Sequence, residues 1–172
     1  CVGGTVCVVG RNGFKYGEFS GSFSDEAIVW NNTEVLGSGI DDIGKAYEEI
    51  GKQLNVPVLK LRYMPREMSF KELQIRGKKA VIKFQFGKNI IRLVEISGYQ
   101  ETIDVHVSDR VIYDKVYNRQ LKQDIFLSKN ELENGQIEFG ASIKSDTAYY
   151  YFSGILSEEE FDKIVNEFYF AQ

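Results

Sequence analysis

Residues 70–97 read FKELQIRGKKAVIKFQFGKNIIRLVEIS, a stretch in which apolar side chains alternate with polar ones. Alternation with a period of two is typical of a β-strand that buries one of its faces. Two short links, Gly77-Lys78-Lys79 and Gly87-Lys88-Asn89, interrupt the alternation and favour tight turns. The stretch therefore predicts a three-stranded antiparallel meander.

More strands are predicted after the meander. Ile103, Val105 and Val107 alternate with polar residues. Similar patterns predict further strands around residues 111–117, 122–127, 136–144 and 147–153. Short links between successive strands favour antiparallel pairing, and one face of such a sheet can stay in contact with solvent.

A helix is predicted before the meander. Over residues 40–54, apolar side chains recur every three or four positions and so line one helical face. Ser38 and Asp41 form a capping-box-like start, and Asn55 and Pro57 end the pattern.

A second helix is predicted at the end of the chain. Ser157 and Glu160 have the spacing of a capping box, and Leu156 is placed to pack against Phe161 as a hydrophobic staple. The apolar stripe of this helix consists of Phe161, Ile164, Val165 and Phe168. Together these elements predict an α+β fold, in which two helices pack on one face of a large, curved antiparallel β-sheet.

Length and composition set limits on the class of protein. The chain has 172 residues, of which 43% are apolar, and this is enough to bury a sizeable core. A net charge of −4 argues against a dedicated nucleic-acid binder. We expect one α+β domain over residues 36–172, preceded by a strand, hairpin and loop segment over residues 1–35 that belongs to the same structural unit.

The first residues bear on the cellular location. Residues 1–10 begin at Cys1 and carry no charged side chain. Three interpretations stay open: the lipid-bearing cysteine of a bacterial lipoprotein, a start that follows a removed anchor or signal sequence, and a plain β-strand. A disulfide between Cys1 and Cys7 is not favoured, because in a tight hairpin Cys1 would face Val6.

The sequence predicts no catalytic residue, cofactor or metal site. His106, the only histidine, shares a strand face with Asp104, and Asp109 and Asp114 are near it in sequence. A histidine and a carboxylate so placed could share a proton or a metal ion. An ordinary solvent-facing side of the sheet explains the same pattern, and we prefer that interpretation.

Charge is distributed unevenly along the chain. Between Lys60 and Arg92, ten basic residues are opposed only by Glu67 and Glu72, so this segment carries +8 and the remainder −12. Such a segment can bind lipid head groups, an acidic wall polymer or an acidic protein, or it can pair with the acidic remainder and protect strand edges. The candidate surface for an anionic partner consists of Arg76, Lys78, Lys79, Lys83, Lys88 and Arg92.

Three segments together resemble a bacterial family of domains of unknown function, number 4367. They are the helix from Asp41 to Leu54 with the Asn55–Pro65 stretch that follows it, the meander from Phe70 to Ile96, and the ending from Tyr149 to Glu160. The similarity spans roughly residues 40–170. It implies an extracytoplasmic module of membrane-tethered proteins related to anti-sigma factors, and it implies no catalytic residues.

We therefore expect a non-catalytic sensing or protein-interaction domain of a membrane-tethered bacterial protein, located outside the cytoplasm and held by a tether or a lipid. Its partner is expected to be a protein or an anionic ligand of the cell envelope. Nucleic acid is not expected, and the membrane is contacted only through a tether or the protein surface. The alternative is a carrier for a lipid or other hydrophobic ligand between sheet and helices.

Overall fold

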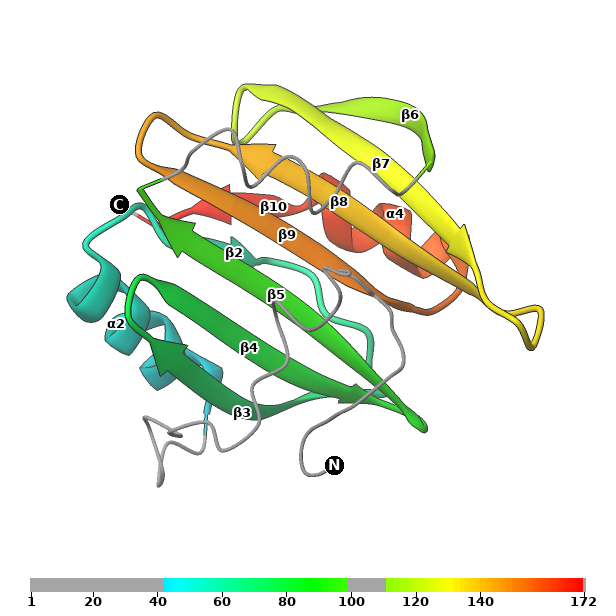
Figure 1. Cartoon of the computed structure of the whole chain (residues 1–172), viewed down its shortest axis with the longest axis horizontal. Coiled ribbons are helices and arrows are strands. Elements are labelled where there is room, and N and C mark those ends of the chain that lie inside the picture. Colours follow the sequence, from blue (N-terminus) through cyan, green and yellow to red (C-terminus); the bar gives the residue numbers. More distant parts are fainter. Residues whose placement is uncertain (1–41, 99–110, 172) are drawn as a thin grey trace, which may run out of the picture. The chain divides into compact units, whose positions relative to one another are not determined.

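The computed structural model describes residues 42–98 and 111–171, all within one structural unit. The strands of its large sheet are β3 (Met68–Arg76), β4 (Lys79–Phe86), β5 (Asn89–Ser97), β6 (Val111–Asn118), β7 (Gln123–Glu131), β8 (Ile137–Lys144) and β9 (Ala148–Ile155). Their order across this seven-stranded sheet is β3-β4-β5-β9-β8-β7-β6, and every neighbouring pair is antiparallel (Figure 1). The predicted α+β fold is confirmed.

The meander of β3, β4 and β5 forms as the alternation predicts. Both of its turns place a glycine in the left-handed region, Gly77 with φ 61° and Gly87 with φ 63°. This conformation costs a residue with a side chain more than it costs glycine. The register of β3 against β4 shifts between Phe70 and Glu72, so Lys71 forms a bulge.

Three elements cover one face of the sheet (Figure 1). They are helix α2 (Ile43–Leu54), helix α4 (Glu158–Asn166) and a two-stranded sheet of β2 (Leu59–Leu61) and β10 (Phe168–Phe170). Helix α2 contacts β3 and β4, whereas α4 contacts β6 and β8. Two helices on one face were predicted, but the small sheet between them was not.

Helix α2 begins at Ile43, three residues after the start of the predicted range 40–54. Its N-cap is Asp42, whose carboxylate accepts a hydrogen bond of 2.9 Å from the N–H of Lys45. Such a bond satisfies one of the free N–H groups of the first turn, so Asp42 takes the role that the sequence pattern placed at Ser38. The predicted end is confirmed, because Asn55 caps the helix with φ 55°.

Helix α4 starts as predicted and ends earlier. The hydroxyl of Ser157 accepts a hydrogen bond of 3.2 Å from the N–H of Glu160, which confirms the cap. Phe168, predicted on the apolar stripe of the helix, lies instead in β10 opposite Leu61 of β2. Its ring is fully buried and packs edge-on against Phe152, with the ring centres 5.3 Å apart. The prediction that Phe168 is buried is therefore confirmed, whereas its assignment to the helix is wrong.

No helix among the described residues is long and apolar enough to cross a membrane. The strand predicted around residues 103–107 and the segment 1–35 lie outside the described residues, as do Cys1 and Cys7.

Candidate functional site

The six candidate basic residues lie on or beside the meander. Arg76 is directly opposite Lys79 across β3 and β4, and Lys83 is directly opposite Arg92 across β4 and β5. Side chains alternate along a strand, and the intervening residues Ala80, Ile82 and Leu93 belong to the core under the helices. These four basic residues therefore point to the opposite side, which we call the second face of the sheet.

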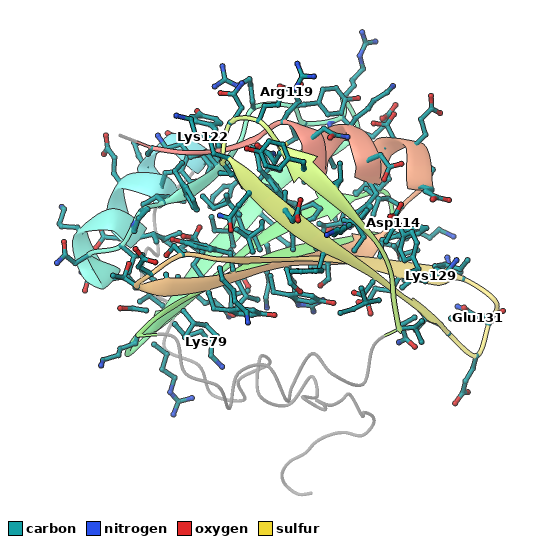
Figure 2. The ribbon with its side chains drawn as sticks, turned by 90° about the horizontal axis from the view of Figure 1, so that it is seen from above. Lys79, Asp114, Arg119, Lys122, Lys129 and Glu131 are labelled. Atoms are coloured by element: carbon teal, nitrogen blue, oxygen red, sulfur yellow. The ribbon has the colours of Figure 1, made fainter. Side chains whose placement is uncertain are left out.

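The structure does not bring all six residues together. Lys78 lies in the turn between β3 and β4, whereas Lys88 lies in the turn between β4 and β5, at the other end of the strands. Figure 2 shows Lys79 on the side of the sheet away from the helices. Arg76, Lys78 and Lys88 are exposed, whereas Lys79, Lys83 and Arg92 are half-buried.

The two opposed pairs on the second face place like charges side by side. Burial, and then the nearby guanidinium of Arg76, lowers the pKa of Lys79 to about 8. Burial and the guanidinium of Arg92 likewise lower the pKa of Lys83. Like charges directly opposite each other in a sheet destabilise it. Glu72 offsets part of this repulsion through an ion pair of 3.3 Å with Lys83.

Buried polar groups continue the row that contains Lys83 and Arg92. Ser153 of β9 is opposite Arg92, Gly140 of β8 is opposite Ser153, and Ser128 of β7 is opposite Gly140. Within residues 42–98 and 111–171, Nε of Arg92 and Oγ of Ser128 are buried and have no hydrogen-bond partner. Buried donors usually have partners, and among the described residues no acceptor meets Nε of Arg92.

The sequence pattern did not single out the two serines of this row, Ser153 and Ser128. A small polar residue in a strand carries no signal by itself, and Ser153 and Ser128 are 25 positions apart. They share a row with Arg92 only because β9 and β8 lie between β5 and β7. Gly140 lies between Ser153 and Ser128 in this row. A larger residue does not fit there, because a Cβ would collide with the Tyr151 hydroxyl.

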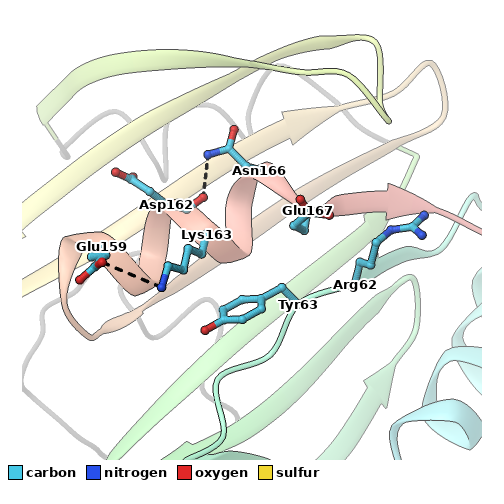
Figure 3. Close-up of a pocket in the computed structure, with 7 residues that line it drawn as sticks. All are labelled: Arg62, Tyr63, Glu159, Asp162, Lys163, Asn166 and Glu167. Carbon is cyan, nitrogen blue, oxygen red and sulfur yellow. Dashed lines mark hydrogen bonds and ion pairs between the residues drawn. The ribbon is translucent and has the colours of Figure 1, made fainter.

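A groove of about 630 Å³ lies on the opposite side of the molecule, between α4 and the chain that follows β2 (Figure 3). Several of its lining side chains have polar partners: Lys163 pairs with Glu159 at 3.9 Å, and Tyr63 donates a hydrogen bond of 2.8 Å to Glu160. Charges of both signs line the groove, so it shows no preference for an anion over a cation. Its lining consists of Arg62, Tyr63, Glu159, Asp162, Lys163, Asn166 and Glu167.

The described residues include no group of three or more histidine, cysteine, aspartate or glutamate side chains that could hold a metal ion. Asp114 lies on β6 close to the acidic side of α4. Burial and the nearby carboxylates of Glu158 and Asp114 raise the pKa of Asp162. His106 lies outside the described residues, as do Asp104 and Asp109.

The structure also contains a buried acid that the sequence pattern did not single out. Glu95 of β5 is completely buried, and burial raises the pKa of its carboxyl to about 8. The sequence contained a signal for this burial. Glu95 follows Leu93 by two positions and Ile91 by four, so its side chain lies on the same strand face as these two apolar residues.

No protein-family model, curated protein or solved structure matches this chain. The resemblance to the family of unknown function therefore stays a prediction.

Proposed function

We propose that this chain is a non-catalytic binding domain that holds an anionic partner on the second face of β3, β4 and β5. The proposal is supported by two pairs of like-charged residues that lie directly opposite each other on neighbouring strands. They are Arg76 with Lys79 and Lys83 with Arg92. An anion placed over these pairs would relieve their mutual repulsion and accept hydrogen bonds from the exposed side chain of Arg76.

The family resemblance supports an extracytoplasmic sensing or interaction role within a membrane-tethered bacterial protein, so the proposed partner is a protein or an anionic ligand of the cell envelope. The carrier function is less well supported. Fully buried aromatic rings, among them Tyr150, Phe152 and Phe161, occupy the layer between the sheet and the helices. A carrier would need open space there.

Binding of the chain to anionic lipid vesicles and to poly-glutamate, measured over a series of salt concentrations, tests the proposal. We expect binding at low ionic strength that weakens as salt is added, since salt screens exposed charges. A basic residue near an anionic surface contributes about 1 kcal/mol, so the double variant Arg76→Gln/Lys78→Gln should bind about thirtyfold more weakly at low salt.

The matched control is Lys45→Gln/Lys52→Gln, which removes the same charge from exposed positions on α2. It should lose much less affinity than the meander variant. Absence of binding even at low ionic strength would overturn the proposal, and so would an equal loss in the control. Binding to the vesicles but not to poly-glutamate would identify a lipid surface as the source of the anion. The opposite result would identify an acidic polypeptide.

The pH dependence of binding provides a second prediction. With a pKa of about 8, Lys79 carries its positive charge below that pH and loses it above. One positive charge near an anionic surface contributes about 1 kcal/mol, which is a factor of roughly five in affinity. Affinity for the anionic ligand should therefore fall by roughly fivefold between pH 7 and pH 9. Lys79→Arg keeps the charge over this range and should bind equally at both pH values. An unchanged fall in Lys79→Arg would assign the pH effect to another group.

A further inference from the structure

The carboxyl group of Glu95 lies between the large sheet and the small sheet of β2 and β10, which we call the β2–β10 cover. One oxygen, Oε1, accepts a hydrogen bond of 3.4 Å from the N–H of Leu59 in β2. The other, Oε2, is buried and has no hydrogen-bond partner among the residues that the structure describes. The side chain of Glu95 is 0% exposed.

Within the part of the chain that the structure describes, three polar contacts attach the β2 side of the cover to α2 and to the large sheet. Besides the bond to Glu95, the hydroxyl of Tyr47 in α2 accepts a hydrogen bond of 3.0 Å from the N–H of Leu61. The hydroxyl of Tyr150 in β9 donates one of 2.6 Å to the carbonyl of Pro57. Glu95 is the group among these three that can ionise near neutral pH.

The surroundings of Glu95 offer little to balance a negative charge. Among the described residues, the titratable groups that face it are Tyr47 from α2 and Tyr150 from β9, and burial raises the pKa of both phenols, so they stay neutral. The ammonium of Lys60, the residue after Leu59, lies 5.2 Å from the centre of the Tyr47 ring. A buried charge without a partner is strongly destabilising, so an ionised Glu95 must reach water.

The cover is the element that can move to admit water. It consists of three residue pairs, Phe168 with Leu61, Tyr169 with Lys60 and Phe170 with Leu59. In contrast, β5 is held in the large sheet by eight pairs to β4 and six to β9. Short pairings with few contacts open before long ladders do.

We propose that Glu95 makes the attachment of the β2–β10 cover pH-dependent: its protonated carboxyl favours the closed arrangement, and loss of the proton favours local opening of β2 and β10 while the seven-stranded sheet stays folded. The open form brings the carboxylate into water and uncovers the aromatic rings of Tyr150 and Phe152, which contact Phe170 and Phe168 of β10 in the closed form.

The direction of the effect follows from the two pKa values of Glu95. Its pKa is about 8 in the closed form and close to the ordinary 4.5 once water reaches it. The closed form is therefore fully favoured below pH 4.5 and loses its advantage as the pH rises towards 8. Between these limits the opening equilibrium should increase about tenfold for each pH unit.

Amide hydrogen exchange of the full chain, followed by NMR between pH 5 and pH 9 and corrected for intrinsic rates, tests the proposal. Protection of Leu59, Leu61 and Ala171, whose N–H groups donate to Glu95, Tyr47 and the carbonyl of Val58, should fall about a hundredfold between pH 5 and pH 7, whereas protection in β8 and β9 should not. Glu95→Gln keeps the shape and the acceptor for Leu59 but cannot ionise, and its protection should not depend on pH. Glu131→Gln, the same change at an exposed carboxyl on β7, should behave like the wild type.

The side-chain carboxyl carbon of Glu95, titrated in the same samples, should report a pKa well above 4.5. Three outcomes would overturn the proposal: protection of the cover that does not depend on pH, the same dependence in Glu95→Gln, or simultaneous loss of protection in β8 and β9. The last result would mean that the whole domain unfolds rather than the cover alone.

Discussion

Replacement of Phe161 by alanine should lower the free energy of unfolding by about 3–5 kcal/mol, the range for truncation of a buried phenylalanine. The Phe161 ring is 0% exposed. It stacks on Phe139 of β8 with ring centres 5.2 Å apart and on Phe152 of β9 at 6.2 Å. The substitution thus leaves a cavity between α4 and the sheet and removes two aromatic contacts, each contributing about 0.5–1.5 kcal/mol.

Urea denaturation followed by circular dichroism measures this effect. The matched control is Phe126→Ala on β7, which removes the same side chain from a position that is 45% exposed. We expect the control to cost less than about 1 kcal/mol, because an exposed side chain leaves no cavity. Equal losses in the two variants would contradict the assignment of Phe161 to the centre of the core.

The start of α4 was predictable because its signals are local. The cap formed by Ser157 with Glu160 and the apolar residues Phe161, Ile164 and Val165 lie within nine positions of one another. The meander was predictable for the same reason, since turns and strands alternate within one short stretch. In both places neighbouring residues determine the structure with little help from distant parts of the chain.

The elements that sequence analysis missed depend on contacts between distant residues. β2 pairs with β10 although more than one hundred positions separate Leu59 from Phe170, and neither three-residue strand has a pattern of its own. Phe168 fits the helical stripe by spacing, yet pairing with Leu61 and packing against Phe152 place it in a strand. Tertiary packing here overrides the local periodicity.

The candidate site was predictable in part. A count of charges located the basic segment, and alternation within the meander then determines that Lys83 and Arg92 share a face. The insertion of β9 between β5 and β8, which adds Ser153 to the row, is a property of the strand order. Local patterns do not determine that order, because several antiparallel arrangements satisfy the same alternation.

Gly154→Ala should destabilise the protein by roughly 1–3 kcal/mol, the usual cost of added volume in a packed core. Gly154 lies in β9 opposite Phe139, and a Cβ at this position would be 2.6 Å from Cγ1 of Ile91 and 3.1 Å from its Cβ. Both atoms belong to a fully buried residue of the neighbouring strand β5, which cannot move aside without disturbing the ladder between β5 and β9. The backbone of Gly154 is not in the left-handed region, so the expected cost is steric rather than conformational.

A double-mutant cycle with Ile91→Ala separates this steric explanation from a general weakening of the strand. By itself Ile91→Ala should cost about 2–5 kcal/mol, but it also removes the Cγ atoms that the new methyl group would meet. The double variant should therefore be more stable than the sum of the two single effects predicts, by about 1 kcal/mol or more in urea denaturation. Ile143→Ala provides the matched control, because Ile143 is equally buried but lies on β8 opposite Tyr150, four positions along β9 from Gly154. Its effect should add to that of Gly154→Ala, and additivity in the Ile91 cycle as well would show that contact with Ile91 is not the reason for glycine at this position.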